Sequence, residues 1–316
     1  MTTAPAWRTR TMARRVGYAL LPGDAFSWLL LLRPREWPIM AAHTALGFLL
    51  AWRGAGGHAG SLADSDVLVR LALLMFVWVV CLNGGTLALN SAFDHDEDDV
   101  GYLDAPPPVP RGLAAGSVAL MLAGLGLSLL LPRGVVVAYV VCLVLSMVYS
   151  MPPLRLKSVA GADWLVNMIG FGALTPFAGW AAVGIPNTSW SLLIWTAFAL
   201  LFGAFYPLTQ LYQFGEDRRR GDRTLALALG EQGSLRLAIA FALLAFASFA
   251  AAARLAGVST LGTWALVAAG LAWLALLLPW SVRATRLSAA SHKRGMYVAL
   301  GIWACTDLAV LVAFAR

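Results

Sequence analysis

Nine predominantly apolar runs, each of roughly twenty residues, recur along this chain of 316 residues. A run of this length can cross the hydrocarbon core of a bilayer as one α-helix. With 60% hydrophobic residues, 12% charged residues and a mean hydropathy of +0.74, the chain is unlike a soluble domain. We expect an all-α polytopic membrane protein with about nine transmembrane helices around a central cavity, over residues 37–52, 69–90, 113–131, 134–151, 164–184, 188–212, 235–255, 260–281 and 296–315.

The positive charges predict how the chain crosses the membrane. With an odd number of helices, all but five of the 23 Lys and Arg residues fall on the side of the N-terminus, which is then the cytoplasmic side. We expect an integral protein of a bacterial inner membrane. Residues 1–316 are expected to form one transmembrane domain, of which residues 1–26 are a basic cytoplasmic arm. Topology and anionic lipid account for the net charge of +7, so we expect no nucleic-acid partner.

An acidic cluster ends the second predicted helix. Asn90, Asp94 and Asp98 lie at positions i, i+4 and i+8, so on a helix their oxygen atoms align along one face. A second cluster, with Asp217 one turn after Gln213, follows the sixth predicted helix on the same side of the membrane. The two clusters lie at corresponding places in two blocks of four helices, which suggests two similar halves around the cavity and a ninth helix packed outside them.

The two clusters indicate a site for a diphosphate bound through Mg²⁺. This ion takes one or two carboxylates in a protein and completes its shell with water and substrate phosphate. Basic side chains on the same side of the membrane are candidates for binding the diphosphate oxygens, which carboxylates repel. These residues are Arg111, Arg155, Lys157 and Arg223.

Other functions of the acidic residues fit less well. An ion or proton transporter carries its carboxylates near the bilayer midplane, whereas the predicted spans hold almost no ionisable residue besides His43 and Asp307. We favour a packing role for His43 and expect Asp307 to be protonated or paired. The Gly and Glu of a calcium-binding loop and the Gly-rich motifs of nucleotide sites are missing at the required places.

Four short motifs follow one another along the chain. The first, Arg33-Pro34-Arg35-Glu36-Trp37, precedes the first predicted helix. The others are Asn90-x-x-x-Asp94-x-x-x-Asp98, followed by Arg111, Leu113 and Gly116; Tyr149-Ser150-Met151-Pro152-Pro153-Leu154-Arg155-Leu156-Lys157; and Asp217-x-x-x-Gly221-x-x-Thr224-Leu225. In this order they resemble the signatures of the UbiA superfamily of intramembrane prenyltransferases, and the resemblance runs across most of the chain.

The resemblance implies that Mg²⁺ bridges the acidic motifs to a prenyl diphosphate, whose tail lies in an apolar tunnel. Loss of diphosphate leaves an allylic cation, which an acceptor attacks. The implied metal ligands are Asn90, Asp94, Asp98 and Asp217, and the implied catalytic residues are Asp94, Asp98, Asp217 and Lys157. The implied substrate-binding residues are Arg111, Tyr149, Arg155, Lys157, Tyr212, Gln213 and Arg223.

Two departures from the superfamily pattern indicate a divergent branch. Ser91 and Gln213 stand where the superfamily usually has Asp, and the candidates to compensate for the missing charge are Asp96, Glu216 and Asp222. Three functions remain open: transfer of a prenyl group to a small aromatic or lipid acceptor, cyclisation of the prenyl diphosphate to a terpene, and non-catalytic binding or transport of a lipid.

Overall fold

The computed structural model describes residues 11–21, 24–55, 61–94 and 103–315. Over these residues the chain is largely helical and holds no β-strand, since its bridge between Val159 and Arg223 is an isolated one. The expected fold class, an all-α membrane protein, is confirmed.

Each of the nine predicted spans coincides with a helical segment. These segments are α4 (Trp37–Gly54), α5–η1–α6 (Ser65–Met75, Phe76–Gly84 and Gly85–Asp94), α7 (Leu113–Ser128), α8 (Arg133–Ser150), α9–η3–α10 (Ala162–Asn167, Met168–Leu174 and Thr175–Val183), α11 (Ser189–Gln210), α13 (Leu225–Ala256), α14 (Thr260–Arg283) with η4 (Ala284–Arg286), and α15 (Ala289–Phe314). Seven segments of the described chain are long and apolar enough to cross a membrane, and α4 and α7 complete the expected set.

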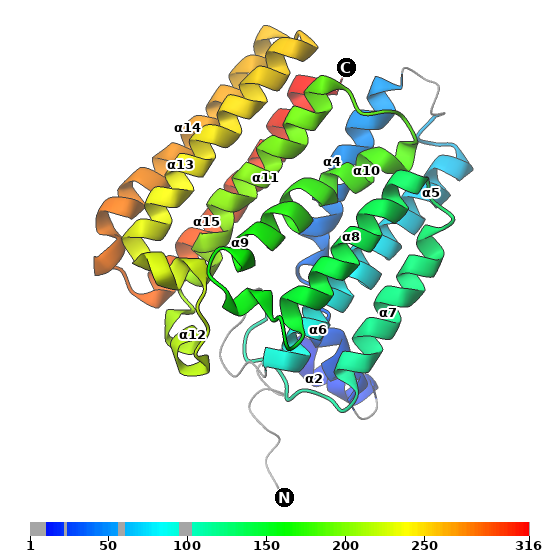
Figure 1. The fold of residues 1–316 in the computed structure, drawn as a ribbon. Helices are drawn as coiled ribbons and strands as arrows, with labels where there is room; N and C mark the ends of the chain where they lie inside the picture. Colours follow the sequence, from blue (N-terminus) through cyan, green and yellow to red (C-terminus); the bar gives the residue numbers. More distant parts are fainter. Residues whose placement is uncertain (1–10, 22–23, 56–60, 95–102, 316) are drawn as a thin grey trace, which may run out of the picture.

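Four short helices lie outside these spans: α2 (Met12–Leu20), α3 (Ala25–Leu31), η2 (Leu156–Ser158) and α12 (Phe214–Arg220). Figure 1 shows α2 and α12 at the same end of the bundle as the C-terminal end of α6 and the N-terminal end of α9. The polar segments that carry the sequence motifs therefore gather at one end of the molecule.

The spanning helices stand side by side, with α13 and α14 on one flank and α7 on the other (Figure 1). Between them, α10 packs closely on α4 and α11 packs closely on α13. Gly47 and Gly179 allow the contact of α4 with α10, because a Cβ atom at either position would overlap main-chain atoms of Pro176 or Thr44 on the other helix. Small residues at helix contacts are common in membrane bundles, where close approach replaces the hydrophobic effect.

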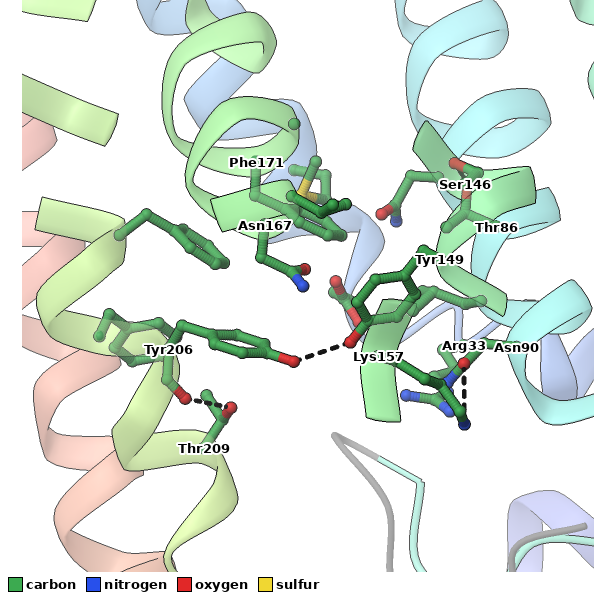
Figure 2. Close-up of a pocket in the computed structure, with 18 of the residues that line it drawn as sticks. Arg33, Thr86, Asn90, Ser146, Tyr149, Lys157, Asn167, Phe171, Tyr206 and Thr209 are labelled. Carbon is green, nitrogen blue, oxygen red and sulfur yellow. Dashed lines mark hydrogen bonds between the residues drawn. The ribbon is translucent and has the colours of Figure 1, made fainter. Parts of the chain in front are cut away.

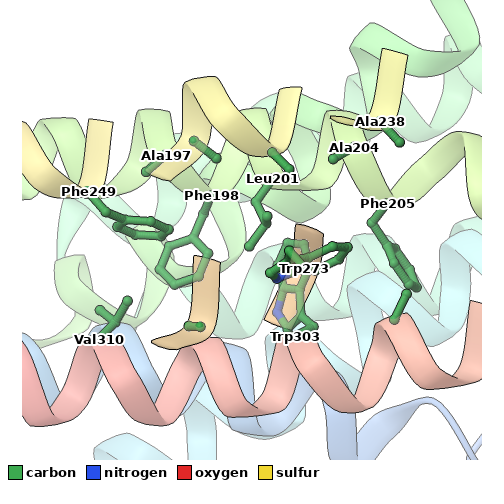
Figure 3. Close-up of a cluster of buried hydrophobic side chains, with 14 of the residues drawn as sticks. Ala197, Phe198, Leu201, Ala204, Phe205, Ala238, Phe249, Trp273, Trp303 and Val310 are labelled. Carbon is green, nitrogen blue, oxygen red and sulfur yellow. The ribbon is translucent and has the colours of Figure 1, made fainter. Parts of the chain in front are cut away.

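A large apolar cluster joins α11, α13, α14 and α15. Figure 3 shows Phe198 and Phe205 of α11 facing Trp303 and Val310 of α15. Where α11 meets α13, the packed residues are small: Ala197 and Ala204 of α11, and Ala238 of α13. The bulky residues fill the space toward α15, while the small ones let α11 and α13 approach each other.

Two spanning helices change to a π-helix within the bundle. The π-helical segments are η1 in the second span and η3 in the fifth. Such wide turns are rare and occur often at functional sites. Asn83 in η1 and Phe171 in η3 both line the main cavity, so the two π-helical segments contribute to its wall.

The sequence had led us to expect the last helix to pack outside the helices around the cavity. In the structure this helix, α15, is part of the cavity wall. Leu300 and Trp303 of α15 line the cavity, and α15 contacts α4 and α11 as well as α14. The expectation was wrong because α15 packs against α4 and α11, the helices that flank the cavity, and brings Trp303 into its wall.

Candidate active site

A cavity of about 270 Å³ lies between α4, α6, α8, α11 and α15. Its polar end, beside α12 and the α8–α9 loop, is lined by Asn90, Asp94, Lys157, Asp217 and Asp222. Its other end, deeper among the spanning helices, is lined mainly by aromatic and aliphatic side chains, including Trp78, Phe171, Phe202, Phe205 and Trp303. The cavity thus joins a charged mouth to an apolar chamber.

The first acidic motif is held at the end of α6. Asp94 is the last residue of this helix and its side chain is only 3% exposed. The amine of Lys157 contacts the Asp94 carboxylate and donates to Asn90 Oδ1 over 3.3 Å (Figure 2). Asn90 and Asp94 therefore present their oxygen atoms to the same cation, as expected for residues one helical turn apart.

The second acidic motif lies on the short helix α12. Gln213 precedes this helix, and its carbonyl oxygen accepts a hydrogen bond from the Asp217 amide over 3.0 Å. Arg220 lies within 3.2 Å of Glu216, 3.0 Å of Asp217 and 3.1 Å of Asp222. One guanidinium therefore gathers the three carboxylates of this cluster. Gly221, in the left-handed conformation with φ of 74°, ends the helix and turns the chain toward Asp222.

The α8–α9 loop joins the two acidic motifs. Pro152 and Pro153 follow the end of α8 and turn the chain out of the helix. One terminal nitrogen of Arg155 then lies 2.7 Å from Asp222 Oδ1, and the other lies 3.5 Å from Asp94 Oδ1. The two clusters are therefore close enough for a single guanidinium to contact both, as a site for one metal–diphosphate group requires.

Burial shifts the ionisation of the charged groups at this end of the cavity. It raises the pKa of the Asp217 carboxyl, while the neighbouring Arg220 opposes the rise. Burial and, secondarily, Arg220 lower the pKa of Lys157 to about 7, whereas the carboxylates of Asp222 and Asp217 act in the opposite direction. Burial also raises the pKa of Glu36 to about 7; this residue precedes α4 and lines the cavity. Charges here are poorly hydrated and respond strongly to an added ion.

The residues at the cavity mouth fit a magnesium ion that is shared with a ligand. Asn90, Asp94, Asp217 and Asp222 offer hard oxygen donors. Among the described residues, no three acidic, His or Cys side chains are close enough together to hold a metal by themselves. A carboxylate from each motif, with phosphate oxygens and water completing the shell, matches the usual coordination of Mg²⁺.

Tyr149 and Tyr212, both predicted from the sequence, lie in the cavity wall together with Tyr206, which was not predicted. The hydroxyl groups of Tyr149 and Tyr206 are 2.7 Å apart and meet across the cavity between α8 and α11 (Figure 2). Gln210 donates to the Tyr206 hydroxyl over 3.3 Å and to Asp163 over 3.1 Å, which links the pair to the start of α9. Tyr212 accepts a hydrogen bond from Gln213 over 3.3 Å.

Seven predicted site residues line the cavity: Asn90, Asp94, Tyr149, Lys157, Tyr212, Gln213 and Asp217. Arg155 does not line it but contacts Asp94 and Asp222, while Arg111 and Arg223 are exposed and are not part of its wall. Asp98, predicted as a metal ligand, and Asp96, a candidate for compensation, lie outside the described residues. Asp222 lines the cavity, whereas Glu216 contacts Arg220 beside it.

Ser91, one of the two departures from the superfamily pattern, is not part of the cavity wall. It is buried, and its hydroxyl oxygen accepts a hydrogen bond from Arg33 over 3.2 Å. Ser91 therefore connects the first motif of the chain to α6. Arg33 itself lines the cavity beside Lys157 (Figure 2), so this motif contributes a cation to the polar end.

Sequence reasoning missed several residues of the site. Arg220 was hidden in a run of three arginines, of which only this one contacts the acidic cluster through three carboxylates. Asn83 is buried in the cavity wall, and neither its amide nitrogen nor its oxygen has a hydrogen-bond partner within the described chain. A polar residue within an apolar span was the available signal for Asn83.

The comparisons with known proteins identify the family of the chain and match its fold. The UbiA prenyltransferase family matches residues 40–303. Lycopene elongase/hydratase of Haloferax volcanii is 30% identical over 234 residues, which are 72% of this chain and 74% of that protein. A structure of digeranylgeranylglyceryl phosphate synthase superposes with a TM-score of 0.65 and 16% identity, covering 92% of this chain and 98% of the other. A UbiA homolog from Archaeoglobus fulgidus bound to GPP and Mg²⁺ gives a TM-score of 0.58 and 18% identity, with 90% and 99% coverage.

Proposed function

Because the chain belongs to the UbiA prenyltransferase family, we propose that it ionises a prenyl diphosphate and transfers the prenyl group to a lipid acceptor within the membrane. The observation that carries the proposal is the single cavity that joins Asp94, Lys157 and Asp217 to an aromatic chamber. The charged mouth suits a diphosphate with Mg²⁺, and the chamber suits the hydrocarbon tail.

At the mouth, the side chains of this chain bind and orient the diphosphate. Asn90, Asp94 and Asp217 would hold Mg²⁺, and Lys157 would contact the diphosphate oxygens. Arg155 contacts a carboxylate of each acidic cluster and Arg220 contacts those of the second, so the two arginines would position these carboxylates and balance their charge. When bound, Mg²⁺ supplies positive charge that stabilises the departing diphosphate.

In the chamber, aromatic side chains protect the allylic cation. Phe202, Phe205 and Trp303 present a continuous aromatic wall, with ring centroids of Phe202 and Phe205 lying 5.8 and 5.9 Å from that of Trp303. Aromatic faces attract cations, and an apolar wall excludes water that would capture the cation early. Ionisation and transfer are therefore carried out by adjoining parts of one cavity.

For the acceptor, we favour an apolar isoprenoid over a small aromatic compound. The relative from Haloferax volcanii is a lycopene elongase/hydratase, and it matches this chain over most of both lengths. The chamber is built mainly from aromatic and aliphatic side chains, which suit a polyene end. An acyclic carotene such as lycopene is the first acceptor to test.

The mouth of the cavity is proposed to face the cytoplasm. The helical ends that carry Asp94, Lys157 and Asp217 lie at the end of the bundle where most Lys and Arg residues of the loops gather. A water-soluble prenyl diphosphate would then enter from the cytoplasm, and a lipid acceptor from the bilayer. Membrane-impermeant labelling of a cysteine introduced at Arg286 in intact and permeabilised cells tests this orientation.

The experiment that tests the function uses the purified protein in lipid nanodiscs. Dimethylallyl, geranyl, farnesyl and geranylgeranyl diphosphates are each supplied with or without lycopene, in Mg²⁺ or in excess chelator. We expect pyrophosphate release that requires Mg²⁺ and a prenylated carotene in the organic extract. Cyclic hydrocarbons formed without acceptor would assign a terpene cyclase instead. Absence of pyrophosphate release with every substrate would favour a lipid-binding protein.

A further inference from the structure

His43 of α4 and Asp307 of α15 form a polar pair deep in the bundle. The Nδ1 atom of His43 lies 3.2 Å from Asp307 Oδ1 and 3.3 Å from Oδ2. Both residues are buried, with 4% and 8% of their surface exposed. An ionisable pair inside a membrane bundle is costly to maintain, and such residues commonly have a function.

The pair leaves the second nitrogen of His43 available. When Nδ1–H donates to the Asp307 carboxylate, the neutral imidazole has its lone pair on Nε2. This Nε2 atom is buried, and no residue of the described chain offers it a hydrogen bond. His43 lines the chamber of the cavity, where its ring packs edge-on against Phe198 and Trp303 at centroid distances of 4.6 and 5.3 Å. The imidazole is thus held in one orientation by a carboxylate and two aromatic rings.

The charge of this pair suits a group that accepts a proton from a carbocation. With His43 neutral and Asp307 ionised, the pair carries one negative charge in an apolar wall. A carbocation in the chamber stabilises that charge, and a proton taken up by Nε2 makes the pair neutral. A carboxylate that orients a histidine and stabilises its protonated form is an established arrangement for general base catalysis.

On the basis of the proposed prenyl transfer, we propose that His43, positioned by Asp307, removes the proton that ends the reaction. Attack of an acceptor double bond on the prenyl cation forms a carbon–carbon bond and leaves a cation on the acceptor. A C–H bond beside that cation then breaks, its electron pair forms the new C=C bond, and the proton passes to Nε2 of His43. His43 is the catalytic residue of this step, and Asp307 is a positioning residue.

The position of His43 separates proton removal from diphosphate release. The cavity is lined on successive turns of α4 by Met40 and His43. It is also lined by Glu36, the residue before this helix. With a rise of about 1.5 Å per residue, His43 lies about 10 Å deeper than Glu36. The departing diphosphate is held at the mouth and is therefore poorly placed to remove a proton from the acceptor in the chamber.

The test compares His43→Gln and Asp307→Asn with the wild-type protein in nanodiscs, using the prenyl diphosphate and carotene that the wild type accepts. We expect both variants to release pyrophosphate with a nearly unchanged KM. Formation of the deprotonated product should fall by about a hundredfold, with a shift toward water-captured alcohols or misplaced double bonds. Asp307→Glu, which retains a carboxylate, should restore part of the normal product ratio.

Thr306→Val is the matched control. Thr306 is a neighbour of Asp307 on α15, is buried, and accepts a hydrogen bond from Trp273 over 3.1 Å, but it does not line the cavity. This variant should lose thermal stability and keep the product ratio. If His43→Gln is too unstable to purify, Asp307→Asn provides the same readout.

An unchanged product ratio in both His43→Gln and Asp307→Asn would overturn the assignment of the base. A wild-type product that is an alcohol containing oxygen from labelled water would also overturn proton removal from the acceptor cation. In either case the proposed prenyl transfer would stand. Failure of the wild type itself to release pyrophosphate would instead reject the proposed function.

Discussion

The amine of Lys157 lies against the carboxylate of Asp94, where the α8–α9 loop meets the end of α6. A cation suited to phosphate and a carboxylate suited to Mg²⁺ thus occupy the same point at the cavity mouth. A diphosphate bound with Mg²⁺ would satisfy both groups at once, because its oxygen atoms accept from the amine while the metal contacts the carboxylate.

Replacing Asp94 by Asn should reduce turnover by orders of magnitude. The substitution keeps the shape of the side chain but removes a hard anionic ligand from the first motif. Mg²⁺-dependent pyrophosphate release by folded protein in nanodiscs is the measurement. Asp66→Asn is the control, since Asp66 is exposed at the start of α5 and far from the site in sequence. Near-normal turnover of Asp94→Asn would remove Asp94 from the metal site.

Replacing Lys157 by Met should weaken binding of the prenyl diphosphate more than binding of the metal. Loss of a charge-assisted contact to phosphate corresponds to an increase in KM of about tenfold or more. Steady-state kinetics with varied prenyl diphosphate at saturating Mg²⁺ provide the measurement. Arg286→Met, an exposed change of charge in η4, serves as the control. An unchanged KM would leave Lys157 with a role in topology only.

In the second motif, Asp217 should be the main anionic ligand and Gln213 an auxiliary residue. Both line the cavity, but an amide adds no negative charge to offset Mg²⁺. We expect Asp217→Ala to abolish pyrophosphate release, whereas Gln213→Asp should retain it and tighten Mg²⁺ binding in a titration of rate against metal. A tolerated Asp217→Ala together with an inactive Asp222→Ala would transfer the role of ligand to Asp222, which shares Arg220 with it.

Glu36 should make the stability of the protein depend on pH. Burial raises the pKa of its carboxyl to about 7 in the folded protein, from 4.5 in its reference state. The folded state therefore favours the protonated form, and this contribution, about 3 kcal/mol, is lost as pH rises from about 4.5 to 7. We expect Glu36→Gln to melt at a higher temperature than the wild type at pH 7.5 and at a similar temperature near pH 5. Parallel melting curves across this range would contradict the prediction.

The sequence was sufficient to predict the spanning helices and the elements that carry the site. Apolar runs of membrane length are a local signal, and each predicted span coincides with a helix. The spacing of Asn90 and Asp94 also predicted their common face, because helical periodicity is local. The convergence of Asp94 and Lys157 was indicated by the superfamily motifs and not by the spacing of residues alone.

The remainder of the site depends on contacts between distant helices. His43 and Asp307 lie near opposite ends of the chain, so nothing in the sequence indicated that the two residues pair. Arg220 could not be distinguished from Arg218 and Arg219 before the turn at Gly221 was known. The place of α15 in the cavity wall was also missed, since helix order along the chain does not determine which helices adjoin.

The π-helical segment η1 determines which way the first acidic motif faces. Each residue of an α-helix is rotated by about 100° from the one before it, so a wide turn changes the direction of every side chain that follows. Asn90 and Asp94 follow η1 in the same continuous helical segment and both face the cavity. Deleting one residue within Phe76–Gly84 would restore ordinary α-helical winding and turn both side chains away from Lys157. A change of one residue in the lipid-embedded part of the helix would thus remove the proposed metal site without altering any of its proposed ligands.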